Sequence, residues 1–173
     1  MVLRAVQVKM KVSYEDMLKS LHVATERIKA INGKPDAKCN YTRDISFFEY
    51  VCQMAESICA EIVVARYLGY KDFEPTINTF KNEADVGSQF EVKWTKYANG
   101  AMIIYDNDRN SDIAILVTGK SPNYEIRGWL PVSIAKSKPW RRRDQPTFWV
   151  EQYNLHPIEN LKRSSHGDAA LPM

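Results

Sequence analysis

Periodic patterns of apolar residues divide the first half of the chain into a strand and two helices. Apolar residues at every second position from Val6 to Val12 predict a half-buried strand. Ser13 is a typical N-cap for a helix expected over 14–30. A second helix is expected from Ile45 to a C-cap at Gly69, and its apolar residues cover most of the helical circumference. A helix of this kind is usually buried on nearly all sides, so we expect it to lie against a sheet.

The pattern then changes to short alternating runs separated by turn residues. Asn-Gly is the strongest two-residue hairpin signal, and Asn99-Gly100 predicts a hairpin between the two runs that flank it. A buried helix followed by an antiparallel meander of about four strands is an α+β fold. The expected strands cover 76–80, 90–97, 101–105, 113–119 and 124–132.

The length and composition suit one domain with a single core. The chain has 173 residues, and 45% of them are hydrophobic. We expect the domain to span 1–163 and a mobile polar tail to span 164–173. The net charge is only +3, from 24 Lys and Arg against 21 Asp and Glu. Any surface for nucleic acid must therefore come from local clustering of basic residues.

Targeting and cysteine signals favour a cytoplasmic protein. The first residues carry charge throughout and lack the apolar core of a signal peptide, and no run reaches membrane-spanning length. We therefore expect no membrane partner and no glycosylation at Asn40. Cys39, Cys52 and Cys59 are odd in number and lack Cys-x-x-Cys spacing, so neither a disulfide framework nor a zinc site is indicated. Cys52 and Cys59 are expected to be small core residues of the second helix.

Acidic residues gather around one of the predicted strands. Alternation in FEVKWT places its apolar residues on one face and Glu91 and Lys93 on the other, with Asp85 just upstream. On the preceding helix, Glu61 interrupts an apolar stripe, although Glu56 on the same helix could turn inward instead. An isolated buried carboxylate survives by pairing, by staying protonated or by binding a metal.

This set of residues is suited to phosphodiester chemistry. Converging carboxylates at Glu61, Asp85 and Glu91 would repel one another unless a cation neutralised them, and hard oxygen ligands select Mg²⁺ or Mn²⁺. Lys93 could orient a water or stabilise negative charge on a phosphate. The alternative for Asp85, Glu91 and Lys93 is a solvated hairpin face with a surface ion pair.

Asp85 and Glu91-Val92-Lys93, preceded by a helix that carries Glu61, resemble the PD-(D/E)XK nuclease superfamily. The likeness is to small phage-encoded members, through the segments AEIVVARYLGY, DVGSQFEVKW and ILVTGKSPNYEIRGWLPVSIAK. It implies a restriction-endonuclease-like core, in which helices flank a central mixed sheet, and metal-dependent cleavage of DNA in the host cytoplasm. Asp85 and Glu91 would be metal ligands, Lys93 the catalytic lysine, and Glu61 an accessory acid for a second cation or a water. Ala84 stands where the family motif has its proline.

A basic cluster follows the last predicted strand. It could bind backbone phosphates while Phe148 or Trp149 stacks on a base or packs the sheet edge. The alternative is a charged surface loop whose tryptophans fill the core. A basic strip beside an acidic metal site is physically reasonable, because the acids alone would repel the substrate. The candidate nucleic-acid-binding residues are Lys136, Lys138, Arg141, Arg142 and Arg143.

Other motifs add little. Asp106, Asp108 and Asp112 have the acid density of a calcium loop but lack its glycine and its closing glutamate, so a turn is expected. The histidines are scattered, and the chain has neither a Gly-x-Ser-x-Gly nucleophile motif nor a glycine-rich phosphate loop.

The sequence therefore predicts a Mg²⁺- or Mn²⁺-dependent endonuclease that hydrolyses DNA. Its catalytic residues would be Glu61, Asp85, Glu91 and Lys93, and a homodimer would let two sites cut two strands. The alternative is a DNA-binding accessory protein that retains the fold without cutting. A third hypothesis is a purely structural or partner-binding protein.

Overall fold

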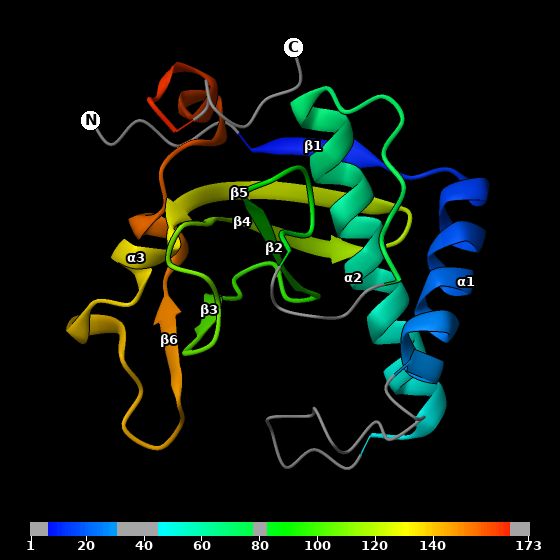
Figure 1. Cartoon of the computed structure of the whole chain (residues 1–173), viewed down its shortest axis with the longest axis horizontal. Helices are drawn as coiled ribbons and strands as arrows, with labels where there is room; N and C mark the ends of the chain where they lie inside the picture. The colour runs from blue at the N-terminus through cyan, green and yellow to red at the C-terminus, as the bar shows by residue number, and fades with distance from the viewer. Residues whose placement is uncertain (1–6, 31–44, 78–82, 167–173) are drawn as a thin grey trace.

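Two helices lie on one side of a mixed sheet, and a small second sheet lies on the other side (Figure 1). The computed structural model describes residues 7–30, 45–77 and 83–166. The α-helices are α1 (Tyr14–Ala30), α2 (Phe47–Leu68) and α3 (Val132–Ala135). The strands are β1 (Val8–Lys11), β2 (Phe90–Thr95), β3 (Met102–Tyr105), β4 (Ile113–Lys120), β5 (Asn123–Pro131) and β6 (Thr147–Val150). The 3-10 helices are η2 (Lys138–Trp140), η3 (Gln152–Asn154) and η4 (Ile158–Arg163).

Capping residues set the ends of both long helices. The Ser13 hydroxyl accepts a hydrogen bond from the Asp16 backbone N–H at 3.1 Å, and the Asp16 carboxylate accepts one from the Ser13 N–H at 2.8 Å. Ser46 and Glu49 form the same reciprocal capping box at the start of α2. Gly69 ends α2 in the left-handed conformation, with φ 93°. The predicted Ser13 and Gly69 caps are therefore confirmed.

Helix α2 is buried on all sides only in its second half, which packs against the main sheet. All residues from Ile58 to Ala65 are buried, including Cys59. The first turns of α2 instead pack on one side against α1, through Tyr50 and Val51. Cys52 lies in these first turns and is exposed, so the expectation that it is a core residue is wrong.

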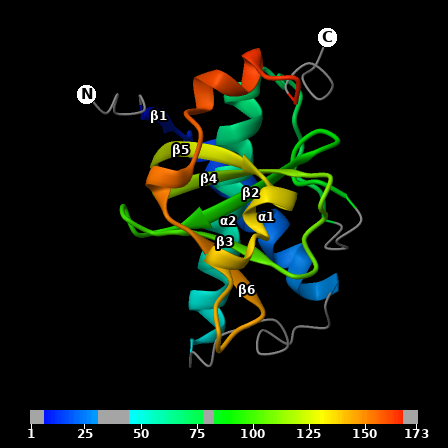
Figure 2. The ribbon, with the colours of Figure 1, turned by 90° about the vertical axis from the view of Figure 1, so that its left-hand side faces the viewer.

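The main sheet has the strand order β1-β5-β4-β2. β2 runs parallel to β4, whereas β1 and β4 both run antiparallel to β5. The sheet is therefore mixed, as the family resemblance implied. Side chains of β4 alternate between two cores: Ile113, Ile115 and Val117 pack toward α2, and Ala114 and Leu116 pack toward the small sheet. Figure 2 shows β6 and α3 in front of the main sheet and α2 behind it.

The predicted hairpin at Asn99-Gly100 is wrong, and with it the simple antiparallel meander. β3 pairs with β6 in the second sheet and not with β2. Gly100 does not have the positive φ that a tight hairpin turn would need. It lies over Thr95, and a Cβ at Gly100 would be only 2.5 Å from Thr95 Cγ2. The chain therefore folds back across the sheet face, where Met102 and Ile104 become buried.

The turn between β4 and β5 is confirmed as an antiparallel connection. No helix within the described ranges combines the length and the apolarity needed to cross a membrane. Cys39, Asn40, residues 78–80 of the strand expected over 76–80 and residues 167–173 of the expected tail lie outside the described residues.

Candidate active site

Strand β2 places its charged residues on the face opposite α2. Phe90 is fully buried, and Val92 and Trp94 pack beside it against the core under α2. Glu91 and Lys93 therefore point to the other face, as alternation predicts. Their side chains are only 12% and 11% exposed. The alternative of a solvated hairpin face is thus wrong for these two residues, because they are neither in a hairpin nor exposed.

Lys93 is held between two carboxylates. Its Nζ lies 2.8 Å from Glu91 Oε1 and 2.7 Å from Asp108 Oδ2, and the Asp108 side chain is 0% exposed. The same Asp108 oxygen accepts a hydrogen bond from the Tyr105 backbone N–H at 2.9 Å. Burial alone would lower the pKa of the Lys93 ammonium, but the Glu91 and Asp108 carboxylates outweigh burial and raise it. Lys93 therefore stays charged.

A tight turn before β2 positions Asp85. Val86 and Phe90 exchange backbone hydrogen bonds of 3.0 and 3.2 Å across this turn. Gly87 has φ 58°, a left-handed conformation that favours glycine, and a Cβ at this position would push the Tyr70 hydroxyl, which would be only 2.3 Å away. Asp85 Oδ2 accepts a hydrogen bond from the Val92 N–H at 2.8 Å, which fixes the carboxylate beside β2.

The neighbouring carboxylates also affect the pKa of Asp85. Burial raises the pKa of Asp85 well above its ordinary value, and the Glu61 and Glu91 carboxylates raise it further. The Glu91 carboxylate likewise contributes to raising the pKa of Glu61, after the larger effect of burial. Glu61, Asp85 and Glu91 therefore influence one another electrostatically, and their sharing of one cation stays a prediction.

Glu61 is paired with an arginine that the sequence did not single out. Both Glu61 oxygens accept hydrogen bonds from Arg27 on α1, at 2.8 and 2.9 Å, and the two side chains are 5% and 9% exposed. Arg27 Nε also donates to the Thr76 carbonyl at 2.8 Å. Glu56 turns elsewhere and accepts hydrogen bonds from Ser121 and Tyr124 at the β4–β5 turn. Glu61 is therefore the residue of this pair that faces the acidic cluster, and Glu56 has a structural role.

We define the acidic cluster as Glu61, Asp85, Glu91 and Asp108 with the cations Arg27 and Lys93. These four carboxylates and two cations leave two negative charges in excess if all are ionised. In this part of the described chain, no three Asp, Glu, His or Cys side chains are gathered as a ready-made metal site. The pairs with Arg27 and Lys93 account for where Glu61 and Glu91 point.

Asp108 and Arg27 are the members that sequence reasoning missed. Asp108 stands in an acid-rich turn whose neighbours have ordinary partners: Asp106 pairs with Arg141 and Asp112 with Arg109. The observed turn geometry confirms the expectation that this segment is a turn. Arg27 lies on the face of α1 that packs against α2. A charged residue among the apolar residues of that face is the only sequence feature that could have indicated its role.

The five predicted nucleic-acid-binding residues gather around one open hollow of about 510 Å³ between α3 and β6. We call this the basic hollow, and its sixth lining residue is Phe148. The Arg142 guanidinium lies 4.3 Å from the centre of the Trp149 ring, and the Arg141 guanidinium lies 4.9 Å from that of Phe148.

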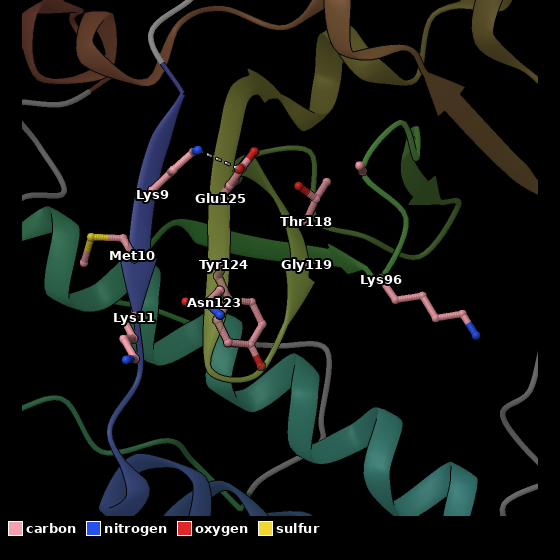
Figure 3. Close-up of a pocket in the computed structure, with 10 residues that line it drawn as sticks. Lys9, Met10, Lys11, Lys96, Thr118, Gly119, Asn123, Tyr124 and Glu125 are labelled. Carbon is pink, nitrogen blue, oxygen red and sulfur yellow. Dashed lines mark ion pairs between the residues drawn. The ribbon is translucent and has the colours of Figure 1, made fainter.

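A second hollow, of about 460 Å³, lies beside β1, β4 and β5 (Figure 3). Its lysines come from β1 and from the segment after β2, but Glu125 also lines it, and Lys9 points to Glu125 with 3.8 Å between the charged atoms. Glu125 also pairs with Arg127 at 2.9 Å. This mixed lining carries less positive charge than the basic hollow.

Comparison of the chain with family models, with curated proteins and with solved structures finds no match.

Proposed function

We propose that the protein is a Mg²⁺- or Mn²⁺-dependent endonuclease that hydrolyses phosphodiester bonds of DNA on a restriction-endonuclease-like core. The observation that supports this proposal most is the set of Asp85, Glu91 and Lys93, each partly or fully buried, on and beside one strand. Glu61 faces the same cluster from α2. The basic hollow is connected to this set by the loop 105–110, which contacts Lys136 and carries Asp108, the partner of Lys93.

The candidate ligands have the chemistry that a hard divalent cation prefers, although they are not gathered around one point in the described structure. All of these ligands are carboxylate oxygens, which Mg²⁺ and Mn²⁺ prefer. The raised pKa of Asp85 shows that its ionised form is disfavoured beside Glu61 and Glu91, and a cation would relieve this repulsion. Asp85 and Glu91 would hold the ion, and Glu61 would hold a second cation or a water. When bound, the ion would supply an activated water and stabilise charge on the phosphate.

The protein's own residues then have distinct tasks. Lys93 keeps its positive charge between Glu91 and Asp108, so we assign it to stabilising negative charge on the scissile phosphate and orienting the water. The Val92 N–H holds the Asp85 carboxylate in place. Burial raises the pKa of Glu61, and Arg27 opposes this rise and orients the carboxylate through two hydrogen bonds. The low exposure of the cluster excludes bulk water, which strengthens each of these interactions.

A second candidate is a DNA-binding accessory protein that does not cut. It is favoured by the pairing of Glu61 with Arg27 and of Lys93 with Asp108, because these pairs hold the cluster together without any further ion. The basic hollow would serve either protein. The homodimer and the location in the host cytoplasm stay predictions.

The test is cleavage of plasmid and branched DNA with Mg²⁺ or Mn²⁺. Asp85→Asn and Lys93→Ala should each reduce cleavage by about 100-fold or more, because each removes a charge at the reacting phosphate. Asp72→Asn makes the same chemical change as Asp85→Asn at an exposed position and should cleave as the parent does. No cleavage by the parent, with DNA binding that needs no metal, would establish the accessory protein instead.

A further inference from the structure

The cations of the basic hollow fall into two groups with different contacts. Lys136 Nζ donates hydrogen bonds to the carbonyls of Asp106 and Asp108 and to Asn110 Oδ1, at 3.0, 2.5 and 2.8 Å. Arg141 donates two hydrogen bonds to the Asp106 carboxylate, at 2.6 and 3.1 Å. Lys136 and Arg141 therefore hold the loop 105–110, in which Asp108 is positioned to pair with Lys93.

The other group faces solvent. Lys138, Arg142 and Arg143 are exposed, and none of them forms an ion pair with a carboxylate among the described residues. The Arg142 backbone N–H donates to the Thr147 carbonyl at 2.9 Å, so this arginine is fixed against the first residue of β6. Three exposed cations at one hollow are suited to a polyanion.

The Phe148 and Trp149 rings beside the hollow each contact an arginine. The Arg142 guanidinium lies over the Trp149 ring, and the Trp149 indole N–H donates to Thr147 Oγ1 at 3.1 Å. Arg141 lies over Phe148, which is buried. A base that stacked on Trp149 would have to displace Arg142. The rings therefore orient the arginines, and the guanidinium edges remain available to phosphate oxygens.

We propose that Lys138, Arg142 and Arg143 bind the phosphodiester backbone of DNA without reading its bases, and that Lys136 and Arg141 hold the loop of the acidic cluster instead. The choice of DNA as the polyanion rests on the proposed function. Phosphate contacts position a protein on DNA but carry no sequence information. Any sequence preference in cutting would then arise elsewhere.

Binding is measured with the full chain in EDTA, so that no cleavage occurs, on duplexes of two unrelated sequences over a series of salt concentrations. Arg142→Gln and Arg143→Gln should each lower the magnitude of the salt slope by about 0.9. The parent should bind the two sequences within about twofold of each other, because phosphate contacts do not discriminate between bases. Lys11→Gln is the matched control: it removes an exposed cation from the second hollow and should leave the slope unchanged.

Two further variants separate the roles within the hollow. Lys136→Gln should lower the melting temperature and leave the salt slope of the parent, because this amine contacts the loop. Trp149→Leu should weaken binding no more than Arg142→Gln does, whereas loss of a stacked base would weaken it by roughly 5- to 150-fold with no change in slope. Thermal melts confirm that the arginine variants are folded.

The inference is overturned if Arg142→Gln and Arg143→Gln keep the parent slope, if the parent binds no DNA, or if one sequence binds more than about tenfold better and Trp149→Leu abolishes that preference. Its failure is distinct from failure of the proposed function. A protein that binds as expected but never cuts supports the inference and refutes the nuclease. A protein that cuts while both arginine variants bind normally refutes only the inference.

Discussion

Charged side chains have opposite environments in the acidic cluster and in the basic hollow. In the cluster, charged side chains are buried and paired with each other, as Glu61 is with Arg27 and Lys93 is with Asp108. In the hollow, Arg142 and Arg143 are exposed, and Arg142 rests on an aromatic ring. Buried charges interact strongly because water is excluded, whereas exposed charges gain little from one another and remain available to a partner. This difference is what we expect of a chemical centre beside a binding surface.

Breaking the buried pair should have the largest effect. Arg27→Leu leaves the Glu61 carboxylate buried without its two hydrogen bonds, so we expect the free energy of unfolding to fall by about 3–5 kcal/mol. Urea denaturation measures this change. The double variant Arg27→Leu/Glu61→Leu should recover much of the loss, because no buried charge is left alone. Equal instability of the single and double variants would contradict the role assigned to Arg27.

Changing pH should expose the repulsion within the cluster. Burial and the carboxylates of Glu61 and Glu91 raise the pKa of Asp85 in the folded state above its unfolded value of about 3.9. The folded state therefore binds this proton more tightly, and the stability that the proton contributes is lost as pH rises from the unfolded pKa through the folded pKa.

In metal-free buffer, the parent should accordingly lose stability relative to Asp85→Asn as pH rises through this window, by at most about 1.4 kcal/mol per pH unit. Chemical denaturation of both proteins between about pH 4 and pH 8 measures the difference. Curves that stay parallel would show that Asp85 titrates normally.

Adding metal should reverse that repulsion. Mg²⁺ at ten times its dissociation constant should stabilise the parent by about 1.4 kcal/mol, seen as a rise in melting temperature. Asp85→Asn should lose this shift, and Asp72→Asn should keep it, since Asp72 is exposed and outside the cluster. An equal shift in all three proteins would place the ion elsewhere.

The smallest effect should come from the arginine on its ring in the basic hollow. A double-mutant cycle of Arg142→Gln and Trp149→Leu should show a coupling of about 0.5–1 kcal/mol in the free energy of unfolding. The cycle of Arg143→Gln with Trp149→Leu is the matched control and should show none. A coupling of zero in both cycles would mean that the ring does not hold Arg142 in solution.

Short-range patterns in the sequence were sufficient for the helices and for four of the six charged residues of the acidic cluster. The Ser13 and Gly69 caps, the buried second half of α2 and the two faces of β2 all follow from periodicity and neighbouring residues. The same patterns identified Glu61, Asp85, Glu91 and Lys93 and the basic residues that line one hollow. These features depend on neighbours a few positions away, which the sequence displays directly.

Only the tertiary structure decided which partners those elements have. Asn99-Gly100 forms no hairpin, because β2 pairs with β4 and β3 pairs with β6. Burial of both faces of the sheet outweighs one local turn preference. Arg27 meets Glu61 across 34 positions, and Lys93 meets Asp108 only because β3 crosses the sheet face. Such pairings depend on how distant segments pack, and no local pattern of residue types contains that information.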